Sequence, residues 1–221
     1  MSIFERAPLL EALKAGADQL QLSLPDESLE KLLDYLALLQ KWNGVYNLTA
    51  VRDPKQMLTQ HVLDCMAALP AFTHARRVLD VGSGGGLPGV VLAIWALHAA
   101  PEMRIDMIDT VHKKTAFLTQ AKAELGLTNV KVHTGRVEQF QSPEKYDVIT
   151  SRAFAELGDF IQWSGHLLAD PGEMIALKGQ ARTMEKETMP EGWCIKKIDA
   201  LTVPGMEAER HLVHIEKIRK N

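Results

Sequence analysis

A glycine-rich segment directly after a short apolar run constrains this chain more than any other feature. It reads VLDVGSGGGLPG over residues 78–89, and five of the eight residues from 82 to 89 are glycine. Glycine adopts positive φ and lets the backbone approach a ligand closely. A helix that follows offers unpaired N–H groups to the same place. The segment predicts a strand, a ligand-binding turn and a helix; the alternative is a tight turn without a ligand.

The chain alternates between strand and helix patterns from residue 77 onward. Strands are expected over 78–81, 104–109, 130–134, 146–150 and 173–177, and helices over 88–98, 113–125 and 156–169. This alternation predicts an α/β fold with a mostly parallel, doubly wound sheet. Two further strands, 195–203 and 211–218, have no helical pattern between them. They predict an antiparallel C-terminal hairpin at the sheet edge.

The first 75 residues have a helical pattern. Leucines recur at helical spacing over about 26–43, with Gly44 near the expected C-cap. Asp53-Pro54 is typical of a helix start, and this helix should stop before Pro70. We therefore expect one globular unit, with an N-terminal helical extension (1–75) packed on a core (76–221).

Composition limits the classes of function. The net charge is −3 and the pI is about 6.2, so any RNA contact must depend on local basic clusters. The two cysteines are far apart, which favours a reducing, cytoplasmic setting. No apolar run approaches the roughly 20 residues of a membrane span. We find no metal-binding motif.

The glycine segment fits two cofactor patterns. Gly84-x-Gly86-x-x-Gly89 matches the dinucleotide fingerprint, which would indicate an NAD-dependent oxidoreductase. Asp80-x-Gly82-x-Gly84-x-Gly86 matches the pattern of S-adenosylmethionine (SAM) methyltransferases. Asp109, at the end of the second strand, can accept both ribose hydroxyls of either cofactor. The antiparallel tail favours the methyltransferase.

Short segments spread from about residue 20 to 215 resemble one family in the same order. They are KWN (41–43), YNLT (46–49), HVLD (61–64), the glycine segment, RVE (136–138), SRAF (151–154), ALKGQ (176–180) and ERHLV (209–213). Together they resemble the bacterial small-subunit ribosomal RNA guanine-N7 methyltransferases, also called glucose-inhibited division protein B.

This resemblance implies a Rossmann-like fold, a cytoplasmic monomer, SAM as methyl donor and N7 of a guanine in 16S ribosomal RNA as target. The near-neutral charge favours an assembled ribosomal particle over free RNA as the substrate. By position in the motifs, Gly82 and Leu87 should line the methionine and ribose side of SAM, with Gly84 also binding the cofactor, and Val137 with Glu138 should flank the adenine. Asp109 matches the ribose-binding acid of methyltransferases in general, and Arg152 should reach the cofactor or the target base. A non-catalytic ribosome assembly factor is the alternative within the same resemblance.

Guanine N7 carries a free lone pair, so this reaction needs no general base and depends on positioning and charge. Three cations fall at strand ends: Arg152, Lys178 and Arg210. We expect them to contact guanine O6 and phosphates, because a cation beside N7 would oppose the charge that develops there. Each has an ordinary alternative, which is a structural ion pair for Arg152, a solvated strand end for Lys178 and a surface pair for Arg210.

Two pairs of residues in the extension leave alternatives open. His61 and Asp64 lie at positions i and i+3 of a predicted helix. They are either part of the site or an ordinary capping or packing pair, and the sequence favours the ordinary interpretation at least as much. Trp42 and Tyr46 have the spacing of one helix face. They either stack on a base or pack beneath the N-terminal helices, and the second interpretation is favoured.

Overall fold

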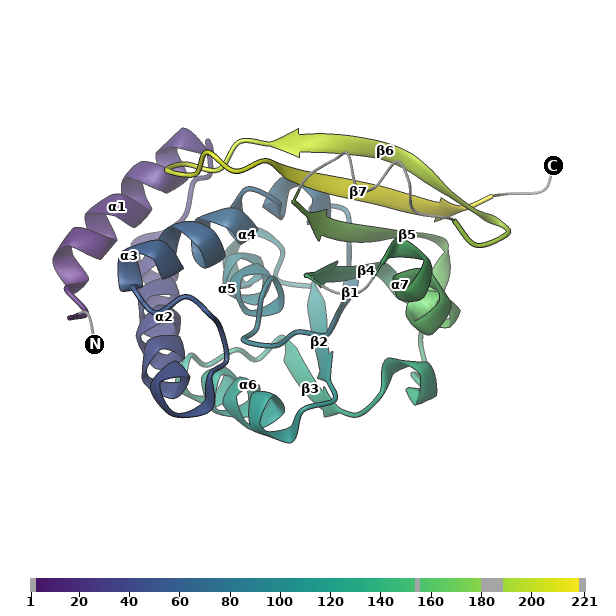
Figure 1. The fold of residues 1–221 in the computed structure, drawn as a ribbon, viewed down its shortest axis with the longest axis horizontal. Helices are drawn as coiled ribbons and strands as arrows, with labels where there is room; N and C mark the ends of the chain where they lie inside the picture. Colours follow the sequence, from purple (N-terminus) through teal and green to yellow (C-terminus); the bar gives the residue numbers. More distant parts are fainter. Residues whose placement is uncertain (1–2, 154–155, 180–188, 219–221) are drawn as a thin grey trace.

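The computed structural model describes residues 3–153, 156–179 and 189–218, and its centre is one mixed sheet (Figure 1). Within these residues the strands are β1 (Arg77–Val81), β2 (Arg104–Asp109), β3 (Val130–Thr134), β4 (Tyr146–Arg152), β5 (Leu168–Lys178), β6 (Trp193–Leu201) and β7 (Arg210–Lys217). Their order is β3-β2-β1-β4-β5-β7-β6. β1 to β5 are parallel, and β7 is antiparallel to β5 and β6. The predicted parallel sheet and antiparallel C-terminal hairpin are confirmed.

The predicted helix over 156–169 is wrong in its second half, and the fifth strand begins earlier than expected. α7 (Leu157–Ser164) gives way to the short 3₁₀ helix η4 (Gly165–Leu167), and β5 starts at Leu168. The Asp170-Pro171-Gly172 sequence resembles a turn but lies inside β5. There the pairing with β4 shifts, from Tyr146 opposite Leu168 to Val148 opposite Glu173. A bulge in the ladder therefore absorbs the residues that local pattern assigns to a loop.

The helical extension begins with α1 (Arg6–Gln19) and α2 (Asp26–Tyr46). α2 runs past Gly44 and is closed by Asn47, whose φ is 51°. The expected end of this helix near residue 43 is therefore early by about one turn. Asparagine adopts this left-handed conformation more readily than most residues, which explains the cap.

The helix predicted from Asp53-Pro54 is confirmed at its start. The Asp53 carboxylate accepts hydrogen bonds from the Lys55 and Gln56 N–H groups. The run is not uniform: α3 (Pro54–Met57) passes into a π-helical segment, η1 (Leu58–Leu63), and then into α4 (Asp64–Met66). A short 3₁₀ helix, η2 (Leu69–Phe72), leads to β1. π-Helical turns are often found at functional sites.

Helices cover both faces of the sheet because residues alternate along each strand. α2, α5 (Gly89–Ala99) and α6 (His112–Glu124) pack on the face that contains Val78, together with the helices of the extension. α7 packs on the opposite face, which contains Leu79. The extension reaches the glycine segment directly, since the hydroxyl of the buried Tyr35 donates to the Gly85 carbonyl at 2.6 Å. The domain division near residue 76 stays a prediction.

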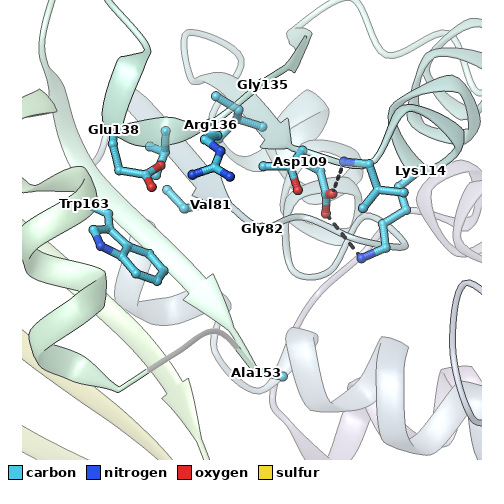
Figure 2. A pocket seen from close by; sticks show the side chains of 13 residues that line it. Val81, Gly82, Asp109, Lys114, Gly135, Arg136, Glu138, Ala153 and Trp163 are labelled. Atoms are coloured by element: carbon cyan, nitrogen blue, oxygen red, sulfur yellow. Dashed lines mark hydrogen bonds and ion pairs between the residues drawn. The ribbon is translucent and has the colours of Figure 1, made fainter.

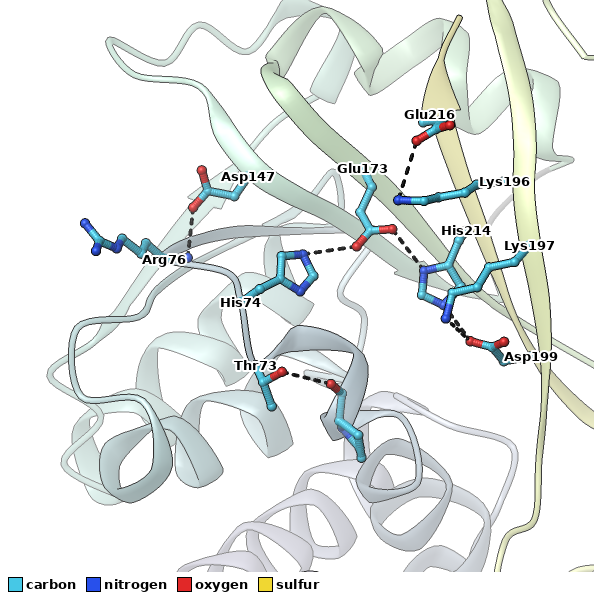
Figure 3. A network of polar contacts seen from close by, with 11 residues as sticks. Thr73, His74, Arg76, Asp147, Glu173, Lys196, Lys197, Asp199, His214 and Glu216 are labelled. Carbon is cyan, nitrogen blue, oxygen red and sulfur yellow. Dashed lines mark hydrogen bonds and ion pairs between the residues drawn. The ribbon is translucent and has the colours of Figure 1, made fainter.

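A polar network joins the C-terminal hairpin to the sheet (Figure 3). His214 of β7 is buried, with Nδ1 3.0 Å from Glu173 of β5 and Nε2 3.2 Å from Asp199 of β6. Glu173 also contacts His74 at 3.0 Å. The network therefore connects three adjacent strands and the segment before β1. Separately, no helix in the described residues is long and apolar enough to span a membrane.

Candidate cofactor and substrate site

The candidate site lies at the carboxyl ends of the parallel strands, where the sheet order reverses. From β1 the chain continues to β2 and β3 on one side, and it then crosses to β4 and β5 on the other side of β1. A crevice forms at such a point in open α/β sheets, and ligands bind there. The glycine segment occupies this place, between the end of β1 and the start of α5.

The glycine segment is a turn that only glycine can form without strain. Gly82, Gly84 and Gly86 have φ of 69°, 56° and 89°. These are the three glycines of the SAM-type pattern. Gly89 needs its missing side chain for another reason, because a Cβ there would lie 2.6 Å from Asp80 Oδ2 and from Met107 Sδ. The turn therefore presents bare backbone to the crevice while α5 packs tightly against the sheet.

Asp80 holds this turn from beneath. Its side chain is buried and accepts a hydrogen bond from the Gly89 N–H at 3.0 Å. Its backbone carbonyl accepts one from the Ser83 hydroxyl at 2.8 Å. Burial raises the pKa of Asp80 to about 7, although the Gly89 hydrogen bond opposes the shift. The acid of the SAM-type pattern therefore has a structural role in the loop.

The larger of two cavities at this place has a volume of about 460 Å³ (Figure 2). Trp163 of α7 and Glu138 lie at one end, and Asp109 and Lys114 lie at the other. Val137 lines the same cavity. An aromatic ring at one end and a carboxylate at the other suit a ligand with a flat base and a sugar.

Asp109 is held in a fixed orientation at the end of β2. Its Oδ1 accepts from the Val111 N–H at 2.8 Å, and its Oδ2 accepts from the Gly84 N–H at 3.0 Å. Lys114 Nζ is 3.6 Å from Oδ2 (Figure 2). A carboxylate oxygen accepts more than one hydrogen bond, so both oxygens keep lone pairs for ribose hydroxyls.

The smaller cavity, of about 210 Å³, adjoins the larger one. They share Gly82, Lys114 and Ala153, and we refer to the two adjoining cavities together as the groove. All seven residues expected to bind the cofactor line this groove: Gly82, Gly84, Leu87, Asp109, Val137, Glu138 and Arg152. Phe154 and Gln180, which belong to the segments quoted from the sequence, lie outside the described residues.

Arg152 is bound to the π-helical region of the extension. Its Nη1 donates to the Gln60 carbonyl at 2.8 Å and to Asp64 Oδ2 at 3.0 Å. Its Nη2 is 3.3 Å from His61 Nδ1. Asp64 accepts from Arg210 Nε as well, at 2.9 Å through Oδ1. Two of the three expected cations thus meet on one carboxylate, whose side chain is only 5% exposed.

The third cation, Lys178, ends β5 and lies opposite His211 of β7. His211 Nδ1 is 2.6 Å from the Gly179 carbonyl, which keeps the start of β7 beside the end of β5. Lys178 and Arg210 line neither cavity of the groove. They belong to its surroundings, whereas Arg152 is part of its wall.

His61 stands between Arg152 and Thr49. Its Nε2 is 2.8 Å from the Thr49 hydroxyl, and the side chain is 6% exposed. Burial and the positive charge of Arg152 lower the pKa of His61 to about 4, so the ring is neutral near pH 7. His61 and Asp64 therefore both contact Arg152, a common partner that their spacing in the sequence did not reveal.

Several groove residues were missed from the sequence. Trp163 and Lys114 line the larger cavity because α7 and α6 pack beside it, and no local sequence pattern predicts this position. Thr49 lines the smaller cavity and belongs to the YNLT segment, which was the available signal. The rings of Trp42 and Tyr46 contact each other at a tilt of 35°, with centroids 4.9 Å apart, and Trp42 packs partly buried against the core, as the favoured interpretation expects.

A family model described as rRNA small subunit methyltransferase G matches residues 28–213. The chain belongs to this family. A relative of that name from Janthinobacterium sp. (strain Marseille) is 63% identical over 98% of this chain and 99% of its own length. Another from Herminiimonas arsenicoxydans is 62% identical over 98% of this chain and 100% of its own length.

Solved structures support the fold of this family member. An O-methyltransferase from Bacillus cereus, in complex with SAH, has a TM-score of 0.57 at 16% identity, covering 83% of this chain and 90% of that one. A SAM-dependent methyltransferase from Aquifex aeolicus has a TM-score of 0.55 at 16% identity, covering 82% and 98%. The expected Rossmann-like methyltransferase fold is confirmed.

Proposed function

We propose that this chain transfers the methyl group of SAM to N7 of a guanine in small-subunit (16S) ribosomal RNA. One observation carries the proposal beyond family membership. The seven residues expected to bind SAM come from four separate segments of the chain, and all of them line one groove at the topological switch point.

The groove has room and chemistry for each part of SAM. Val137, Glu138 and Trp163 would take the adenine, and Asp109 would accept from the ribose hydroxyls. The methionine portion would follow the glycine turn, beside Gly82, Gly84 and Leu87, toward Arg152. When bound there, SAM supplies an electrophilic methyl group on a sulfonium.

The chain's own residues contribute position and charge balance. The lone pair of guanine N7 attacks without prior deprotonation, so no base is needed. Positive charge develops on the purine, and an uncompensated cation nearby would oppose it. Asp64 offsets the charge of Arg152 at 3.0 Å. We assign Arg152 to the wall that orients cofactor and target base, and Lys178 and Arg210 to RNA phosphates at the rim.

The substrate is best described as an assembled ribosomal particle. The net charge of −3 gives little general attraction to free RNA. Several basic residues are also paired internally, such as Arg77 with Glu144 and Lys196 with Glu216. A structured particle would supply shape as well as phosphates. We place the protein in the cytoplasm, where ribosomes assemble, acting as a monomer.

The test begins with tritiated SAM and small subunits from a strain that lacks this gene product. We expect tritium in the 16S RNA, at N7 of one guanine. Tritium-free RNA would refute methyl transfer and favour an assembly role. Calorimetry should show binding of SAM and SAH, whereas binding of NADH alone would favour an oxidoreductase.

Two variants test the assigned residues. Arg152→Ala should methylate roughly 10- to 100-fold more slowly, because a wall that orients the reactants is lost. An unchanged rate would make Arg152 purely structural. Trp163→Phe should weaken SAM binding and remove most of the SAM-dependent change in tryptophan fluorescence, since Trp163 is the tryptophan that lines the described groove. An unchanged fluorescence response would place the adenine elsewhere.

A further inference from the structure

Thr49 lines the smaller cavity of the groove, in a loop that a buried side chain holds in place. Asn43 is 2% exposed, and its amide oxygen accepts from the Thr49 N–H at 2.9 Å. The same amide donates to the Val51 carbonyl at 2.9 Å. Thr49 lines the smaller cavity together with Leu87 and Arg152. The backbone of Thr49 is therefore held by Asn43, while its side chain is at the cavity wall.

The contacts of His61 determine which of its nitrogens carries the proton. A guanidinium only donates, so His61 Nδ1, 3.3 Å from Arg152 Nη2, must be the acceptor. The proton of the neutral ring is then on Nε2, which donates to Thr49 Oγ1 at 2.8 Å. In the opposite tautomer the proton on His61 Nδ1 would point at the N–H of Arg152 Nη2, which is also a donor. The low pKa of His61 agrees with this, because the ring stays neutral at physiological pH.

The hydroxyl of Thr49 is consequently left with a proton to donate. A threonine hydroxyl accepts two hydrogen bonds and donates one. Its two acceptor positions receive His61 Nε2–H and the Val51 N–H, the latter at 3.2 Å. Within the described part of the chain, nothing accepts the remaining proton. The relay from Arg152 through His61 therefore makes Thr49 a neutral donor available to a ligand in the cavity.

We propose that Thr49 donates this hydrogen bond to O6 of the target guanine and so selects guanine over adenine. The inference rests on the proposed function. O6 lies beside N7 on the same edge of the base, and it only accepts, whereas adenine carries an amino donor at that position. A neutral donor can reach O6 without adding a cation near N7. Arg152 fits this role less well, because its Nη atoms are directed at Gln60, His61 and Asp64.

The first test compares three threonine variants on unmethylated small subunits under single-turnover conditions with saturating SAM. Thr49→Val keeps the shape but removes the donor, and we expect a roughly 10- to 100-fold slower transfer with unchanged SAM affinity. Thr49→Ser should recover most of the rate. Thr59→Val is the matched control, since the Thr59 hydroxyl bonds only to Lys55 among described residues and lines a different cavity. Thr49→Val acting at the rate of Thr59→Val would overturn the proposal.

The second test changes the target base rather than the protein, and its main comparison uses the wild-type enzyme. Small subunits are reconstituted from ligated RNA that carries 2-aminopurine at the target, which keeps N7 and lacks O6. The wild-type enzyme should methylate it roughly 10- to 100-fold more slowly than guanine, and Thr49→Val should show a much smaller difference. Equal wild-type rates on both bases would overturn the role of Thr49. Absence of transfer even to guanine would instead refute the proposed function.

Discussion

Asp64 carries the strongest prediction about how the site is held together. Its carboxylate joins Arg152 at 3.0 Å and Arg210 at 2.9 Å, and its side chain is 5% exposed. Asp64→Asn keeps the shape but removes the charge, and its amide N–H₂ must face one of the two arginines. Two partly buried cations would then repel each other without a counter-charge.

The magnitude follows from burial. Breaking a buried ion pair by removing one partner costs about 3–5 kcal/mol. The Arg152 and Arg210 side chains are 19% and 28% exposed, so water solvates them in part. We therefore expect the lower end, about 3 kcal/mol, which corresponds to a fall in Tm of roughly 6–12 °C for a chain of this size.

The assay is thermal and urea unfolding, followed by methyl transfer on small subunits. Asp34→Asn is the matched control, because Asp34 pairs with Arg6 at 2.7 Å but its side chain is 54% exposed. Exposed pairs contribute about 0–1 kcal/mol, so this variant should unfold nearly like wild type. Asp64→Asn should also slow methyl transfer, since Arg152 loses its anchor. Equal Tm values for the two variants would refute the view that Asp64 organises the site.

Two further predictions concern the loop and the pH dependence. Gly89→Ala should cost about 1–3 kcal/mol and weaken SAM binding in calorimetry, because its Cβ would overlap Asp80 and Met107. Gly85→Ala is the control in the same loop, with its nearest contact at 3.2 Å, and an equal loss there would contradict the packing argument. His61 titrates near 6.5 when unfolded and at about 4 when folded, so the unfolded chain binds more protons between these values. Its stability contribution is therefore present above pH 6.5 and lost as the pH falls toward 4, by up to about 1.4 kcal/mol per unit. Asp80 gives the free energy of unfolding the opposite slope with pH between 3.8 and about 7. The free energy of unfolding should therefore be measured against pH for both wild type and His61→Gln, so that the contribution of Asp80 cancels in the difference. Parallel curves for the two proteins would refute the lowered pKa of His61.

Local sequence predicted the elements whose signals are local. The apolar run before the glycine segment, the acid at 109 and the Asp53-Pro54 start all depend on neighbours within a few residues. The strands β2 and β3 consequently have the predicted bounds. Most of the cofactor residues were predicted from their positions in the motifs of the resembled family. Asp109 and Arg152 end β2 and β4, and the ends of parallel strands meet at one edge of the sheet.

Other features have no local signal. The π-helical turn over 58–63 and the bulge inside β5 depend on what packs against them, so residues 170–172 resemble a loop in the sequence alone. The same holds for the role of the cations at strand ends. The sequence marked Arg152 and Arg210 as charged groups at the right edge and left open whether they bind RNA or acids.

The sequence by itself determined the order of elements, the glycine turn and the family. Only the tertiary structure brought Asp64 to Arg152 and Arg210, which are 88 and 146 positions away along the chain. It likewise aligned Arg152, His61 and Thr49 into a relay that fixes one tautomer. The physical reason is that hydrogen-bond direction and charge compensation depend on atoms that meet only when the sheet, the hairpin and the helical extension have packed together.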